Sequence, residues 1–172
     1  MKNRIYIKDL KENVGKEVII AGWVDVRRDQ GKMVFFDMRD MTGKVQGVIL
    51  PSYKEVIEKA KLIRLEWVLK ITGKVNKRPE KNVKAGVMNG DIELEITGIE
   101  VLAPAESLPF DMSESGYNLE LTTELDNRAL VLRHPKVQAV FRVQETIIDA
   151  FREFMKKNMF FEFQAPSITP AV

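Results

Sequence analysis

Hydrophobic and polar residues alternate with a period of two in five stretches, a pattern typical of strands with one buried face. Gly31 and Gly43 lie between the first three stretches and can supply the positive φ of tight turns. Ser52 and Glu55 form an S-x-x-E pattern, which predicts a capped helix between the third and fourth. The predicted strands are approximately 17–28, 33–39, 44–50, 66–77 and 91–102.

The order of these elements predicts a mainly β fold. Three strands, a helix and two further strands form the element order of a five-stranded Greek-key barrel of the OB type. A split sheet covered by one helix has the same order, so the pattern alone leaves both architectures open.

The last third of the chain has a different pattern. Residues 103–117 read APAESLPFDMSESGY, which predicts a linker. Pro135 can occupy the first turn of a helix, and apolar residues follow at spacings of three and four over about six turns. We expect this apolar stripe to pack on a second copy or on sequence outside the chain.

The residue types limit the possible chemistry. The chain has no cysteine, which excludes disulfides, thiolate zinc sites and a cysteine nucleophile. The single histidine, His134, offers too few imidazoles for a His-rich metal site and has no neighbouring nucleophile. We expect it to be solvated or to cap the following helix. We therefore assign no catalytic and no metal-binding residue.

The chain has no apolar run that could cross a bilayer, and its polar start is unlike a signal peptide. We expect a cytoplasmic protein without a membrane partner. The net charge is only +2, but residues 70–84 hold six basic residues and one acidic residue. Such a patch could hold a polyanion locally, although charge runs are usually solvated.

Phe35 lies on an unusual face of the second predicted strand. The alternation places Val34, Phe36 and Met38 on the core face, and Phe35 on the opposite face with two charged residues. Gln46, on the third predicted strand, would lie beside it. An exposed aromatic ring can stack on an unpaired base for about 1–3 kcal/mol, and an amide can read a base edge. A singly exposed aromatic without a function is the plain alternative.

Other candidates for this surface come from three places. Alternation puts Arg28 on the core side with Val24 and Val26, so only a bulge or strand twist would turn it outward. Arg78 and Asn82 follow the fourth predicted strand, where they could meet phosphates or base edges. Glu93 lies on the polar face of the fifth and could accept hydrogen bonds from a guanine edge.

The segment GWVDVRRDQGKMVFFDMRDMTGKVQGVIL resembles the anticodon-binding OB domain of class IIb aminoacyl-tRNA synthetases, the aspartyl enzymes most closely. The similarity continues through EKNV, GDIELEI, SLPF and LDNRALVLRHP to FFEFQAPSITP, which resembles motif 1 of class II synthetases. The resemblance implies an OB barrel at 1–103, a linker or hinge at 104–134, and the motif 1 helix and short strand at 135–172, where a truncated catalytic domain begins.

The resemblance also implies roles for the candidate residues. Phe35 would stack on the middle anticodon base, a uridine, with Gln46 reading its edge and Arg28 close by. Glu93 would recognise the first base, a guanine. The third base would lie near Arg78 and Asn82. The implied partner is a tRNA anticodon stem-loop.

Motif 1 implies a homodimer, with an interface that includes Phe141, Ile148, Phe151 and Pro166. The chain stops before anything resembling motifs 2 and 3, so we expect no cofactor and no catalysis from this chain alone. ATP and Mg²⁺ would serve the full-length aspartate–tRNA ligase. The family's glycine before the motif 1 strand is Met159 here, and we expect Asn158 to take the left-handed position that ends the helix.

Several alternatives stay open. Residues 128–133 read RALVLR where the family often has RYLDLR, and the parent enzyme could be asparaginyl or nondiscriminating aspartyl, with lysyl less favoured. A freestanding OB-fold protein that binds any single-stranded nucleic acid is a second class, since every base has a face that can stack. A protein-interaction module anchored by Phe35 is a third.

Overall fold

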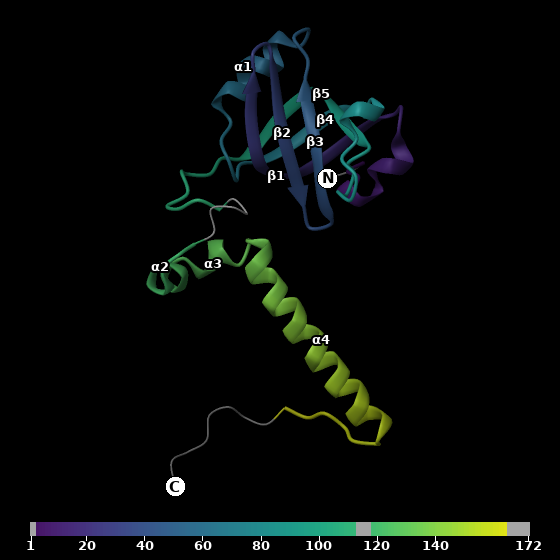
Figure 1. Ribbon diagram of the computed structural model, residues 1–172, viewed down its shortest axis with the longest axis vertical. Helices are drawn as coiled ribbons and strands as arrows, with labels where there is room; N and C mark the ends of the chain where they lie inside the picture. Colours follow the sequence, from purple (N-terminus) through teal and green to yellow (C-terminus); the bar gives the residue numbers. More distant parts are fainter. Residues whose placement is uncertain (1–2, 113–117, 165–172) are drawn as a thin grey trace. The chain divides into compact units, whose positions relative to one another are not determined.

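The computed structural model describes residues 3–112 and 118–164 of the chain (Figure 1). The chain divides into two compact units, Met1–Leu108 and Pro109–Val172, and each is described by itself. Among the described residues, no helix has both the length and the apolar composition needed to cross a membrane.

The first unit is a closed five-stranded barrel with the strand order β1-β2-β3-β5-β4 (Figure 1). Its sheet neighbours pair antiparallel, except β3 and β5, which run parallel. The OB-type barrel is therefore confirmed, and the open split sheet is excluded. The elements are η1 (Ile7–Asn13), β1 (Glu17–Gln30), β2 (Met33–Asp40), β3 (Gly43–Ile49), α1 (Lys54–Leu62), β4 (Val68–Lys77), η2 (Glu80–Asn82) and β5 (Ile92–Ala103).

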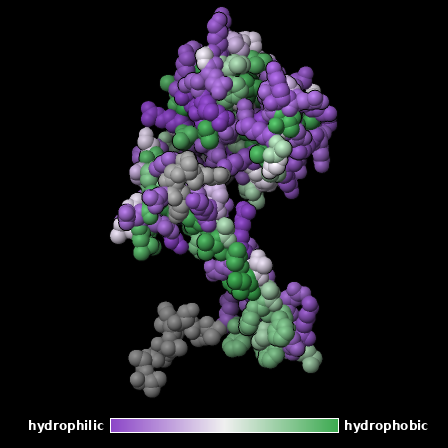
Figure 2. Space-filling model, viewed as in Figure 1, coloured by the Kyte–Doolittle hydropathy of each residue, from purple (hydrophilic) through white to green (hydrophobic). Residues whose placement is uncertain are grey.

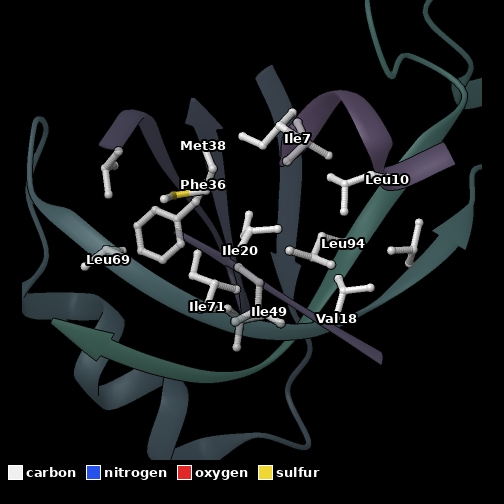
Figure 3. Close-up of a cluster of buried hydrophobic side chains, with 14 of the residues drawn as sticks. Ile7, Leu10, Val18, Ile20, Phe36, Met38, Ile49, Leu69, Ile71 and Leu94 are labelled. Carbon is white, nitrogen blue, oxygen red and sulfur yellow. The ribbon is translucent and has the colours of Figure 1, made fainter. Parts of the chain in front are cut away.

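The barrel interior is filled by the predicted core face. Val34, Phe36 and Met38 of β2 are all buried, and Ile7 and Leu10 of η1 join them in one apolar cluster. Figure 3 shows the side chains of Ile7, Leu10, Phe36 and Met38 pointing into the space between the strands. The alternate residues of β2 are consequently directed to the outer face.

The helix between β3 and β4 begins later than its sequence signal predicts. α1 starts at Lys54 with Tyr53 as its N-cap, and no side chain caps it. The backbone N–H of Tyr53 donates to the Leu50 carbonyl at 3.0 Å. Because this turn includes Ser52, the serine lies before the helix, and the predicted capping box of Ser52 and Glu55 is wrong.

A β-bulge in β1 changes which side chains face outward. The β1–β2 register shifts between Val24 and Val26, so Asp25 is the extra residue. Beyond the bulge, Arg28 pairs with Phe35. The simple alternation that put Arg28 on the core side is therefore wrong, and of the two possible causes, strand twist or a bulge, the register shows the bulge.

The second unit contains three helices among its described residues: α2 (Leu121–Asp126), α3 (Arg128–Val131) and α4 (Pro135–Lys157). The long helix beginning at Pro135 is confirmed. His134 is its N-cap and accepts a hydrogen bond at Nδ1 from the Lys136 backbone N–H at 3.2 Å. The histidine is 1% exposed, so the capping role is confirmed and the solvated alternative is wrong.

The end of α4 differs from the expectation. Asn158 is the C-cap with φ of −94°, whereas Met159 takes the left-handed conformation with φ of 65°. The expectation that Asn158 takes the left-handed position is therefore wrong. Residues 160–164 form no strand, and the rest of the predicted motif 1 strand, with Pro166, lies outside the described residues.

Large apolar side chains of α4 remain exposed to solvent within the described structure (Figure 2). They include the three predicted interface residues within the described range, Phe141, Ile148 and Phe151, which are 39%, 39% and 64% exposed. The Arg128 guanidinium lies 5.7 Å from the centroid of the Phe141 ring. The remaining members are Val140, Val143, Ile147 and Phe154.

Candidate nucleic-acid interface

The outer side of the barrel carries two neighbouring rows of cross-strand partners. One row runs from Arg28 through Phe35 and Val48 to Glu95. In the next row, Asp37 of β2 pairs with Gln46 of β3, and Glu93 of β5 pairs with Asn76 of β4. Paired residues lie on the same side of a sheet. We call the surface formed by Arg28, Phe35, Asp37, Gln46 and Glu93 the Phe35 face.

Phe35 lies partly exposed on this face, because the pleat of β2 directs Phe36 into the core. Its two cross-strand partners differ in character. Val48 on one side is 5% exposed, and Arg28 on the other has a side chain that is 38% exposed. The aromatic ring thus has an apolar partner on one flank and a cation on the other, an arrangement suited to a stacked base.

Arg28 is held on the face by a carboxylate of the neighbouring strand. Its Nη2 donates to Asp37 Oδ1 at 2.8 Å, and the Asp37 side chain is 22% exposed. Guanidinium groups carry five donors in a planar fork. Arg28 therefore retains donor capacity for a ligand while Asp37 fixes its direction.

Gln46 is oriented by an arginine from the loop after β4. Arg78 donates from Nη2 to Gln46 Oε1 at 3.0 Å and from Nε to the Ile92 carbonyl at 2.9 Å. Arg78 is only 9% exposed, so its guanidinium is held by the surrounding protein as well as by these two hydrogen bonds. With its oxygen engaged, the Gln46 amide presents its NH₂ group, which can donate to a base carbonyl.

Two glutamates on β5 have different surroundings. Both carboxylate oxygens of Glu95 are engaged, by the Tyr53 hydroxyl at 3.1 Å and by Asn76 Nδ2 at 2.9 Å. The hydrogen bond to Glu95 raises the pKa of Tyr53, with smaller contributions from burial and from the charges of Glu95 and Glu17. Within 3–112 and 118–164, no group donates a hydrogen bond to the Glu93 carboxylate. Glu93 is thus the acceptor open to a ligand.

The structure brings five of the six predicted residues together. Arg28, Phe35, Gln46 and Glu93 belong to the Phe35 face, and Arg78 joins it through Gln46. Asn82 is exposed on η2 and makes no side-chain hydrogen bond within the described residues. The supporting contacts of Asp37, Tyr53 and Asn76 have no signal in the sequence, because they depend on the tertiary pairing of the strands.

The described residues contain no cluster of three or more histidine or acidic side chains that could hold a metal ion. The face instead combines a partly exposed aromatic ring, oriented hydrogen-bonding groups and two guanidinium groups, which are the usual elements of single-stranded nucleic-acid recognition.

Two relatives place these features in context. The chain is 38% identical over 171 residues to the aspartate–tRNA(Asp/Asn) ligase of Natranaerobius thermophilus, covering 98% of the chain and 29% of that protein. It is 36% identical over 157 residues to the aspartate–tRNA ligase of Bacillus licheniformis, covering 91% of the chain and 26% of that protein. The chain thus spans well under a third of the length of these relatives.

A solved structure is similar to this one over nearly the whole length of the chain. A putative aspartyl-tRNA synthetase from Leishmania major superposes with a TM-score of 0.84 at 29% identity, covering 99% of this chain and 35% of that one. Residues 18–102 match the model of the OB-fold nucleic acid binding domain, and residues 120–172 match that of the class II tRNA synthetases (D, K and N). The chain therefore belongs to the class II tRNA synthetases of the D, K and N group, with the OB-fold domain of that group as its N-terminal unit.

Proposed function

We propose that this chain recognises the anticodon of tRNA(Asp) as the N-terminal part of an aspartate–tRNA ligase. The observation that carries the proposal is Phe35, partly exposed between Arg28 and Val48 on the outer side of an OB barrel. The relatives named aspartate–tRNA ligase support the same assignment.

Each base of the anticodon G-U-C has its own residues in this proposal. The middle uridine stacks on Phe35, and the Gln46 NH₂ group donates to a uracil carbonyl, with Arg28 beside it. The guanine at the first position donates from its N–H groups to the Glu93 carboxylate. The third base lies near Arg78 and Asn82.

The parent enzyme would activate aspartate with ATP and Mg²⁺ and transfer it to tRNA in the cytoplasm. Such an enzyme needs the motif 2 and motif 3 segments, which we do not find in these 172 residues. The exposed apolar side chains of α4 support a homodimer, with Phe141, Ile148 and Phe151 in its interface. The family resemblance adds Pro166, which lies outside the described residues. Residues 104–134 would be the hinge between the barrel and the catalytic domain.

A nondiscriminating aspartyl enzyme is the second candidate, because one relative is named for both tRNA(Asp) and tRNA(Asn). The two decoding groups differ at the third anticodon base. Selectivity at that base therefore separates the two candidates.

Titration of the 172-residue chain with labelled anticodon stem-loops tests the proposal. The panel carries G-U-C, a changed first base, a changed middle base, and G-U-U. We expect G-U-C to bind more tightly than the loops changed at the first or middle base. Equal binding of G-U-U would favour the nondiscriminating enzyme. Equal binding of all loops would overturn the proposal in favour of a general single-strand binder.

A further inference from the structure

The β-bulge in β1 decides which arginine lies beside Phe35. In the observed register, Val24 pairs with Met38 and Val26 with Asp37, so Asp25 is skipped. Without the bulge, the pairing that continues from Val24 would place Arg27 opposite Phe35. A slip of one residue turns each side chain of a strand to the other face. Arg28 would then point toward the core.

The hydrophobic pattern of β1 favours that alternative register. It would turn Val26 inward opposite Phe36, whereas in the structure Val26 lies on the outer side, opposite Asp37. Burial of an apolar side chain is favourable, so some other interaction must stabilise the bulge. Asp25 is the residue that the bulge leaves without a cross-strand partner.

Two cations hold Asp25 in the bulged register. Its Oδ1 accepts from Arg39 Nε at 2.9 Å, and its Oδ2 lies 2.8 Å from Lys44 Nζ. In the alternative register Asp25 would directly face Asp37 on the outer side, and like charges at such positions destabilise a sheet. The same carboxylate therefore favours one register and disfavours the other.

Contacts with the segment before β4, the other strand that pairs with β1, also support the bulge. The Arg39 guanidinium donates to the Glu66 carboxylate as well, and lies 5.6 Å from the centroid of the Trp23 ring. Glu66 is 8% exposed and has a left-handed backbone with φ of 64°. Its backbone N–H donates to the Val24 carbonyl at 2.8 Å. These contacts join the bulge to the segment before β4 through Arg39.

We propose that Asp25 is a positioning residue that selects the bulged register of β1 and thereby places Arg28 beside Phe35 for recognition of the middle base. This inference rests on the proposed function for its consequence, but the register itself can be measured without RNA. Asp25 itself would not touch the base.

The experiment compares Asp25→Ala and Asp25→Asn with a matched control, Asp29→Ala. Asp29 lies on the same strand, outside the bulge, and its carboxylate forms an ion pair with the Arg27 guanidinium at 2.8 Å. NMR of the unbound 172-residue chain follows cross-strand backbone contacts of Phe35 with Arg28 and with Arg27. Stem-loop titrations then measure the preference for the middle uridine, alone and in an Arg28→Ala background.

We expect Asp25→Ala to weaken the Arg28–Phe35 contacts, to introduce Arg27–Phe35 contacts, and to reduce the uridine preference about tenfold, or 1.4 kcal/mol. Asp25→Asn should be intermediate, because it keeps an acceptor for Arg39. In the Arg28→Ala background, Asp25→Ala should change the preference no further. The control should match the wild type.

Two outcomes would overturn the inference: an unchanged Arg28–Phe35 register in Asp25→Ala, or an equal loss of preference with and without Arg28. A wild-type chain that binds all stem-loops alike would instead overturn the proposed function, while the NMR comparison would still decide whether Asp25 selects the register.

Discussion

Arg78 donates from Nη2 to the side-chain oxygen of Gln46 at 3.0 Å, joining the loop after β4 to the middle of β3. The family resemblance assigns these residues to different anticodon bases, the third and the middle. Because the arginine fixes the direction of the amide, recognition of the two bases should be coupled.

Arg78→Ala should therefore weaken the preference at the middle base as well as at the third. The loss of one hydrogen bond to a charged donor suggests about 1.5–3 kcal/mol, measured by fluorescence anisotropy with stem-loops changed at each position. Lys77→Ala removes a neighbouring exposed cation and is the matched control. An effect of Arg78→Ala on the third base alone would contradict the coupling.

Glu93→Gln should reduce the preference for guanine at the first position. A carboxylate can accept two N–H donors of a guanine edge, whereas an amide offers only one acceptor atom. We expect a loss of about 1.5–3 kcal/mol in discrimination between guanine and adenine loops. Glu100→Gln, on the same strand and paired with Lys70, should leave it unchanged. If both variants discriminate equally between guanine and adenine loops, Glu93 does not recognise the first base.

Tyr53→Phe should make the stability of the barrel less sensitive to alkaline pH. The hydrogen bond to Glu95 raises the pKa of Tyr53 in the folded state. The stabilisation is therefore fully present below the tyrosine pKa of the unfolded chain, near 10, and is lost as pH rises through the folded pKa. Thermal unfolding from pH 8 to 11 measures this, and identical pH profiles for variant and wild type would refute it.

Phe151→Ser should weaken self-association of the chain. Phe151 is 64% exposed on α4, and burying such a ring at an interface contributes about 1.5–3 kcal/mol. Sedimentation velocity over a concentration series should show a dimer for the wild type and an increase of at least about tenfold in its dissociation constant for the variant. Glu145→Ser, on the same helix, should have little effect. A wild-type monomer at high concentration would rule out this interface.

Much of the barrel could be predicted from sequence because each strand buries one face, and a buried face imposes a period of two. The strands from Glu17, Met33 and Gly43 begin within a residue of their predicted positions. Closure could not be predicted, because it depends on the pairings of β1 with β4 and β3 with β5, which join segments far apart in the chain.

The candidate site was predictable only in part, for a related reason. Phe35 is evident because a large aromatic on a polar face breaks the alternation. The orientation of Arg28 was missed because one extra residue, Asp25, reverses the inward and outward alternation of the later residues of β1. Glu93 and Glu95 are equivalent in sequence, and only the contacts of Glu95 with Tyr53 and Asn76 show which carboxylate is open.

The most direct test of base recognition is the affinity of Phe35→Ala for the G-U-C stem-loop, beside wild type and Tyr6→Ala. Tyr6 is an aromatic residue that is 41% exposed next to η1, with the Arg4 guanidinium 4.8 Å from its ring centroid. Stacking on Phe35 predicts a loss of about 1–3 kcal/mol for Phe35→Ala and little change for Tyr6→Ala. Equal affinity of all three proteins would contradict the assignment of Phe35 as the platform for the middle anticodon base.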